Sequence, residues 1–111
     1  MKKMINGKSY DTDTAELKMV YYNVCLSCDL NSYSELLYLT PNGTWFLYGS
    51  GGCLSRYATL NGASVEGGET IIPMTRKEAK KWAANYASDS QYFRIFHETK
   101  KTINVKKGEK I

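Results

Sequence analysis

The chain has 111 residues, of which 42% are hydrophobic and 23% are charged, and its formal net charge is +4. This length predicts one domain with a modest core, and no stretch reaches the roughly 18 consecutive apolar residues of a membrane-spanning helix. Residues 1–99 hold ten basic and ten acidic residues. This excludes an acidic DNA mimic and the uniformly basic body of a dedicated DNA-binding protein.

The excess positive charge lies at the C-terminus, where residues 100–111 hold five lysines and one glutamate. We expect a single α+β domain at residues 1–99 followed by a basic, flexible tail at 100–111. The lysines that could contact the phosphates of a nucleic acid are Lys100, Lys101, Lys106, Lys107 and Lys110. The N-terminus lacks the apolar core of a signal peptide and the cysteine count is odd, which favours a cytoplasmic location.

Two short segments precede the first long strand. Asn6-Gly7 is a strong hairpin signal and predicts a small terminal hairpin or an edge strand with a turn. Residues 11–14 read as a polar turn, because aspartate and threonine side chains bond their own backbone. Residues 15–24 begin with good helix formers but end in valine and tyrosine, which favours a strand paired with the central hairpin.

The central hairpin is the strongest pattern in the sequence. Two largely apolar runs, at 35–40 and 44–48, flank Pro-Asn-Gly at 41–43, which predicts a three-residue loop that closes with a glycine bulge. This loop places Tyr38 opposite Phe46. Because side chains alternate across a strand, one face carries Leu37, Leu39, Trp45 and Leu47, and the other carries Leu36, Tyr38, Phe46 and Tyr48. We expect the first to be the core face and the second, with its hydroxyls, to be available to a partner.

The three cysteines offer a sharper but less favoured hypothesis. Cys25 and Cys28 form a C-x-x-C pair, and Cys53 with His97 would bring the number of candidate zinc ligands to four. The spacing of a zinc ribbon is missing, and so is the strand-to-helix context of a redox motif. We therefore expect free cysteines and neither a metal nor another cofactor.

Gly49 to Gly52 read as a strand end followed by a turn, since the Gly-Lys-Ser/Thr of a phosphate-binding loop is absent. Residues 53–60 predict a short helical turn that buries Leu54, Tyr57 and Leu60, and residues 61–68 predict a mobile loop. Glu35 and Glu69, each at a strand start, are expected to be solvated.

Residues 69–74 predict a short strand that Pro73 confines to a sheet edge. Thr75 and Glu78 have the spacing of a capping box, and a second helix is predicted from Ser88 or Asp89 to about residue 98. The sequence therefore predicts an α+β fold, an antiparallel sheet of about four strands with one or two C-terminal helices packed on one face.

Catalysis has little support in the residue pattern. His97 is the single histidine, and no neighbour in the sequence supplies the oriented nucleophile and third group of a catalytic triad. We expect no enzyme activity.

Four segments carry a family resemblance: NGKSYDTDTAEL (6–17), SELLYLTPNGTWFLYGSGG (34–52), LSRYA (54–58) and IIPMTRKEAKKWAANY (71–86). Over residues 4–96 the chain resembles a family of small proteins encoded by Gram-positive bacteria and their phages and mobile elements. Cys25, Cys28, Cys53 and the lysine-rich tail depart from that pattern. The resemblance implies a protein that binds and inhibits a host defence protein, as anti-CRISPR proteins inhibit CRISPR-associated nuclease complexes.

Two functional hypotheses follow. The first is a non-catalytic inhibitor whose contact residues with a host protein are Tyr38, Phe46, Tyr48, Arg56 and Tyr57. The alternative is a nucleic-acid-binding protein in which the tail lysines contact phosphates and the aromatic sheet face stacks on bases.

Overall fold

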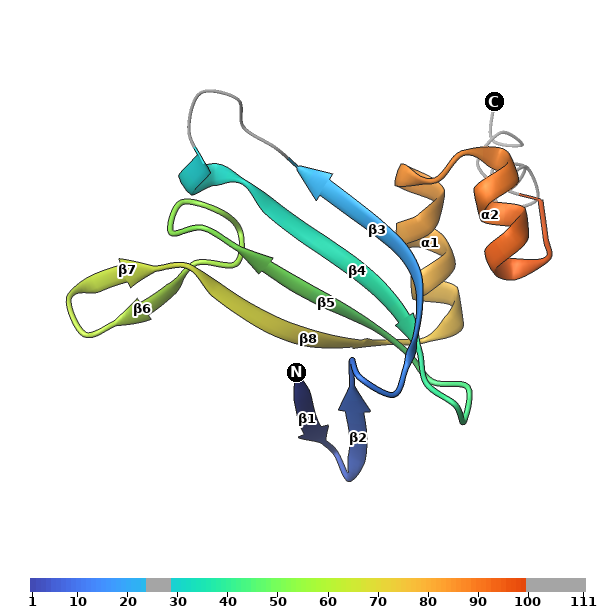
Figure 1. The fold of residues 1–111 in the computed structure, drawn as a ribbon, viewed down its shortest axis with the longest axis horizontal. Helices are drawn as coiled ribbons and strands as arrows, with labels where there is room; N and C mark the ends of the chain where they lie inside the picture. Colours follow the sequence, from blue (N-terminus) through green and yellow to red (C-terminus); the bar gives the residue numbers. More distant parts are fainter. Residues whose placement is uncertain (24–28, 100–111) are drawn as a thin grey trace, which may run out of the picture. The chain divides into compact units, whose positions relative to one another are not determined.

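The computed structural model describes residues 1–23 and 29–99, and its contacts divide the chain into two compact units, Met1–Met74 and Thr75–Ile111. The described strands belong to the first unit, and helices α1 and α2 belong to the second (Figure 1). The predicted α+β class, with a four-stranded antiparallel sheet and two C-terminal helices, is confirmed. The single domain over residues 1–99 and the packing of the helices on the sheet stay predictions. Cys25, Cys28 and the basic tail lie outside the described residues.

The main sheet has the strand order β3-β4-β5-β8 and is antiparallel throughout. Its strands are β3 (Glu16–Asn23), β4 (Tyr33–Leu39), β5 (Trp45–Gly51) and β8 (Gly68–Met74). Two hairpins extend from it: β1 (Lys2–Ile5) with β2 (Lys8–Asp11), and β6 (Thr59–Asn61) with β7 (Ser64–Glu66). A short 3-10 helix, η1 (Asp29–Asn31), precedes β4.

The central hairpin β4–β5 has the predicted register. Tyr38 lies opposite Phe46 and Leu36 lies opposite Tyr48. The amide of Thr40 donates to the carbonyl of Thr44 at 2.8 Å, and Gly43 has a φ of 90°, which only glycine adopts without strain. The loop chemistry at 41–43 thus determines which side chains share a face.

The predicted core face is buried. Leu37, Trp45 and Leu47 expose 0%, 6% and 3% of their surface, and Leu39 is half-buried. The ambiguous segment 15–24 is strand β3, which pairs with β4 as predicted. Its tyrosine-rich end outweighs the helix formers at its start because β3 pairs with the neighbouring strand β4 along its length, with one register shift between Leu17 and Met19.

The N-terminal hairpin confirms the Asn-Gly signal. Asn6 and Gly7 have φ values of 52° and 79°, the left-handed pair that a two-residue hairpin turn requires. The chain then turns at Asp11, whose side-chain Oδ1 accepts from the amide of Asp13 at 2.9 Å, and enters β3. This turn carries β1 and β2 back toward the sheet.

Strand β5 ends at Gly51 and turns follow it, as predicted for residues 49–52, but two expectations for residues 53–68 were wrong. Residues 53–58 form turns that bury Tyr57 but leave Leu54 and Leu60 exposed, and residues 59–66 form the hairpin β6–β7 instead of a mobile loop. This hairpin has a single ladder of three residue pairs, with Gly62 at a φ of 66° in its turn.

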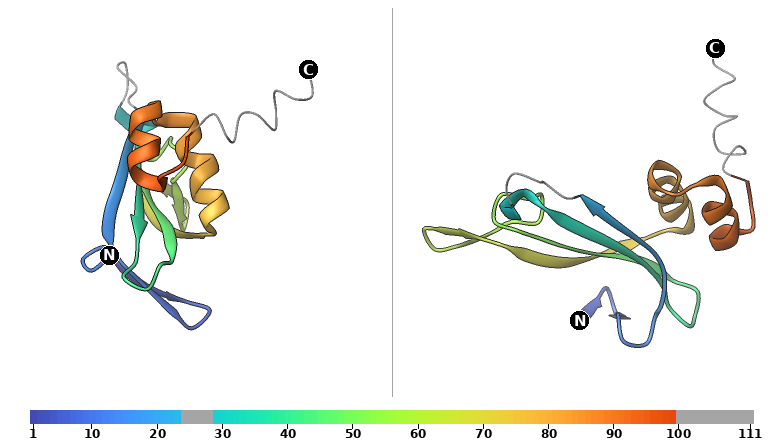
Figure 2. Two further views of the ribbon diagram at one scale, coloured as in Figure 1. Left: turned by 90° about the vertical axis from the view of Figure 1, so that its right-hand side faces the viewer. Right: turned by 45° about the horizontal axis from the view of Figure 1, so that its top comes forward.

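The helical unit contains α1 (Arg76–Tyr86) and α2 (Asp89–Phe96), which form a helical hairpin (Figure 2). The capping box is confirmed, because Glu78 donates its amide to the Thr75 hydroxyl at 3.1 Å and accepts from the Thr75 amide at 2.8 Å. Ser88 caps α2, which ends two residues earlier than predicted because His97 adopts the left-handed conformation at a φ of 58°. Neither of the helices that the structure describes is long and apolar enough to cross a membrane.

Candidate functional site

The aromatic face that the sequence offers to a partner is covered by the N-terminal hairpin. Phe46 is 0% exposed and Tyr38 is 8% exposed. The Tyr10 ring meets the Phe46 ring edge-on at 5.5 Å, and the Tyr38 ring stacks on it at 5.2 Å. Ile71 completes this cluster. Phe46 and Tyr38 are therefore core residues, and the prediction that they contact a partner or stack on bases is wrong for the folded chain.

Tyr48 lies at the rim of the same face and is half-buried. Its hydroxyl donates a hydrogen bond to Oε1 of Glu69, on the neighbouring strand β8. This hydrogen bond is the largest cause that raises the pKa of Tyr48 to about 12. Glu69 is exposed as predicted, so the pair lies at the border between the covered face and the solvent.

A buried carboxylate lies on the opposite face of the sheet. Glu35 of β4 is 2% exposed, so the expectation of a solvated strand-start charge was wrong. Glu35 lies across from Gly49 of β5. Because glycine has no side chain, this position leaves room for the Tyr57 ring. A Cβ at Gly49 would lie 2.1 Å from Cζ of Tyr57. The Tyr57 hydroxyl donates to Oε2 of Glu35, and burial raises the pKa of this hydroxyl well above its usual value.

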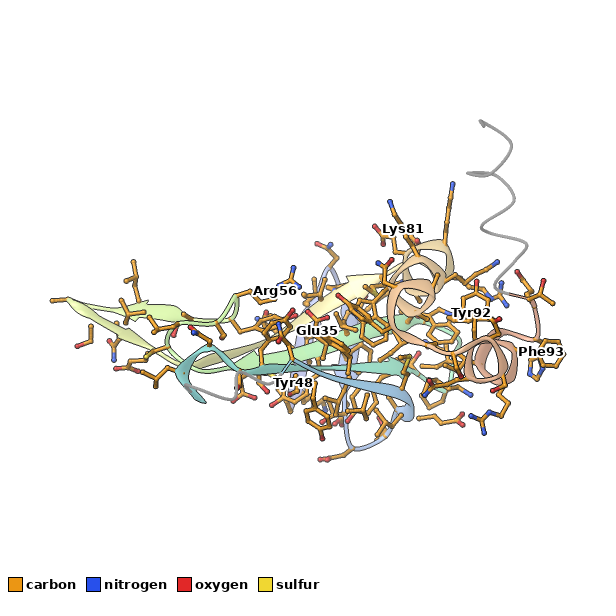
Figure 3. The ribbon with its side chains drawn as sticks, turned by 90° about the horizontal axis from the view of Figure 1, so that it is seen from above. Glu35, Tyr48, Arg56, Lys81, Tyr92 and Phe93 are labelled. Carbon is orange, nitrogen blue, oxygen red and sulfur yellow. The ribbon has the colours of Figure 1, made fainter. Side chains whose placement is uncertain are left out.

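Arg56 is the exposed member of this cluster. Its Nη1 lies 3.4 Å from Oε2 of Glu35, and its Cζ lies 5.5 Å from the centre of the Tyr33 ring. The Arg56 side chain is 57% exposed (Figure 3). Of the five predicted contact residues, the structure brings Tyr38, Phe46 and Tyr48 together on one face of the sheet. Arg56 and Tyr57 meet Glu35 on the opposite face, and Arg56 is the residue of the five that solvent reaches most freely.

The segment that carries Arg56 is anchored by its backbone. The amide of Gly52 donates to the carbonyl of Ser32 at 3.1 Å, and the amide of Leu54 donates to the carbonyl of Leu30 at 2.9 Å. Ser55 closes the turn, since its hydroxyl donates to the Gly52 carbonyl at 2.7 Å. The Glu35 carboxylate therefore holds a turn and compensates the charge of Arg56, which is a positioning role.

Both edge strands of the main sheet have features that disfavour pairing with an additional strand. The β3 edge has a bulge between Leu17 and Met19 with Lys18 at the irregular position, and the β8 edge carries Pro73. A bulge twists an edge away, and proline lacks the amide hydrogen that a new strand would need. Addition of a partner strand to this sheet is therefore disfavoured.

The hairpin β6–β7 is the most exposed ordered part of the sheet unit. We call residues 59–66 the arm, and all of them are exposed. Leu60 and Val65 are cross-strand partners with exposures of 78% and 51%, so they form one apolar face of the arm. On the other face the side-chain Nδ2 of Asn61 donates to Oε2 of Glu66 at 3.0 Å. The arm projects from the sheet beyond the end of β5 (Figure 1).

The base of the arm is tightly fixed although its tip is solvated. A Cβ added at Gly68 would lie 2.4 Å from the carbonyl oxygen of Tyr57. A Cβ added at Gly67 would lie 2.7 Å from the carbonyl oxygen of Gly51. The Tyr57 anchor therefore sets where the arm leaves the sheet. Sequence reasoning missed the arm, although it contains the same Asn-Gly dipeptide as the N-terminal hairpin. Here Asn61 pairs with Ser64, so the two turn residues are Gly62 and Ala63.

Of the residues considered for metal binding, Cys53 and His97 lie in the part of the chain that the structure describes. Within residues 1–23 and 29–99, no group of three or more histidine, cysteine, aspartate or glutamate side chains could hold a metal ion. His97 is exposed at the end of α2, where its ring lies 6.3 Å from that of Phe93. Cys53 is a free, half-buried thiol.

Comparisons with models of protein families, with curated proteins and with solved structures found no match. The resemblance to a family of Gram-positive bacteria, phages and mobile elements therefore stays a prediction.

Proposed function

We propose that the chain is a non-catalytic binding protein that inhibits a host defence protein, and that the arm is its contact surface. The observation that carries this proposal is the exposed cross-strand pair of Leu60 and Val65. A two-stranded hairpin is marginally stable on its own in water. Burial of such side chains against a partner contributes about 1.5–3 kcal/mol each.

Arg56 adds a polar contact next to the arm. Its guanidinium is held over Tyr33 and beside Glu35, so little side-chain freedom remains to be lost when a partner binds. Arginine is one of the residue types that are enriched at binding hot spots. The host-protein partner itself follows from the sequence resemblance, and CRISPR-associated nuclease complexes are the first class to test.

The test measures target cleavage by purified nuclease complexes of Gram-positive hosts with increasing amounts of this protein. We expect cleavage to fall with the wild-type protein and to recover with the double variant Leu60→Ser/Val65→Ser. Leu17→Ser is the matched control, because Leu17 is 46% exposed on β3, outside the arm. Equal inhibition by the arm variant and the wild type would reject the arm. No binding to any such complex would reject the partner class.

A further inference from the structure

We propose a second binding surface, on helix α1, that takes the phosphate backbone of a single-stranded nucleic acid. The charge of the chain is divided between its two units. Residues 1–74 hold five basic and seven acidic residues, a net charge of −2, whereas residues 75–99 hold five basic and three acidic residues, a net charge of +2. Such a concentration of charge attracts polyanions to one unit.

The acidic side chains near the positive residues of α1 are already engaged. Glu78 is held in the capping box by the Thr75 amide at 2.8 Å. Glu98 forms ion pairs with Lys80 at 2.5 Å and with Arg76 at 3.0 Å. Hydrogen bonds from Lys80 and Arg76 keep the pKa of Glu98 below its usual value, so this carboxylate stays ionised at neutral pH.

Lys77 and Lys81 remain outside these pairs. They lie one turn apart on the same side of α1, both are exposed, and neither has a carboxylate within 4.0 Å among the described residues. The Lys81 side chain extends away from the helix into solvent (Figure 3). A lysine ammonium binds phosphate as a point charge, and each phosphate neutralised releases counterions from the nucleic acid.

A nucleic acid fits this unit better than an anionic membrane does. A helix that lies on a membrane inserts an apolar face into the lipid. The apolar residues Ala79, Trp82 and Ala83 of α1 are buried instead. Phe93 of α2 is 50% exposed and gives the same unit an aromatic ring on which an unpaired base can stack, which favours a single strand over a duplex.

The experiment measures binding of the full chain to a fluorescent 20-nucleotide oligothymidylate by anisotropy over a range of salt concentrations. For Lys77→Gln/Lys81→Gln we expect the slope of log K against log salt to flatten by about 1.4, because each phosphate contact to a single strand contributes about 0.7. Phe93→Ala should weaken binding about tenfold with an unchanged slope, since stacking releases few counterions.

The matched control is Lys2→Gln/Lys3→Gln, which removes the same charge from exposed positions of β1. If the control variant weakens oligonucleotide binding as much as the α1 variant does, the proposal is overturned, because net charge alone would then explain binding. The same holds if the α1 variant binds like the wild type, or if the wild type does not bind. Phosphatidylserine vesicles serve as the second probe, and loss of vesicle binding in the α1 variant without oligonucleotide binding would assign the surface to membranes instead.

Discussion

The hydroxyl of Tyr57 donates a hydrogen bond to Glu35, a carboxylate that is 2% exposed on a sheet face. These residues are 22 positions apart in the sequence, and the pairing needs the open space above Gly49. The contact fixes both Arg56 and the base of the arm. It therefore connects the fold of the sheet to the surface that we propose for binding.

Removal of the Tyr57 hydroxyl should destabilise the sheet unit. In Tyr57→Phe the ring still fits over Gly49, but the buried Glu35 loses a donor, at a cost of about 1–3 kcal/mol in the free energy of unfolding. Urea unfolding followed by fluorescence measures this loss. Tyr48→Phe is the control, since its partner Glu69 is exposed and solvent replaces the bond. A larger loss in Tyr48→Phe than in Tyr57→Phe would contradict this role of Glu35.

A methyl group at Gly49 should displace the Tyr57 ring, because its Cβ would lie 2.1 Å from Cζ of that ring. We expect Gly49→Ala to unfold at lower urea than the wild type and to expose Tyr57 to chemical modification. Ser50→Ala, one residue further along β5, is the control and should lose only the weak 3.3 Å contact with Ser34. Wild-type stability of Gly49→Ala would mean that the ring lies elsewhere.

Stability should decline at alkaline pH. The pKa of Tyr48 is raised to about 12 from 10.0, mainly by its bond to Glu69, and that of Tyr57 is raised mainly by burial. Above pH 10 the unfolded chain loses protons that the folded chain retains, so the free energy of unfolding falls as pH rises through these values. Urea titrations from about pH 8 to about pH 11 measure the slope. The double variant Tyr48→Phe/Tyr57→Phe should show a flatter decline, and an equal slope would contradict the assignment.

Phe46 should behave as a core residue. Its ring is 0% exposed between Tyr10 and Tyr38, so Phe46→Ala should cost about 3–5 kcal/mol in the free energy of unfolding. Thermal unfolding measures the loss. Phe93→Ala, at a half-exposed position of α2, should cost far less. Native stability of Phe46→Ala with loss of partner binding would restore the aromatic face as a contact surface.

Short-range features of the fold are predictable from the sequence because few residues determine them. The loop at 41–43 sets the register of β4 and β5 through the conformation of Gly43, and Thr75 with Glu78 begins α1. Both depend on neighbours within four positions.

The candidate site could not be predicted in the same way, because its exposure depends on distant segments. Phe46 is buried because Tyr10 returns over it, and Glu35 is buried because Tyr57 folds back across Gly49. Alternation along a strand identifies two faces but not what covers each. The arm was missed for a different reason, since Asn61 and Gly62 were assigned to a mobile loop over residues 61–68.

Hydrogen–deuterium exchange of the full chain with and without the inhibited nuclease complex tests the central claim most directly. The arm account predicts that amide exchange slows in residues 59–66 on binding, while exchange in β4 and the buried part of β5 does not change. Slower exchange in β1, β2 and the Tyr38–Phe46 region, with an arm that exchanges as fast as before, would contradict the account.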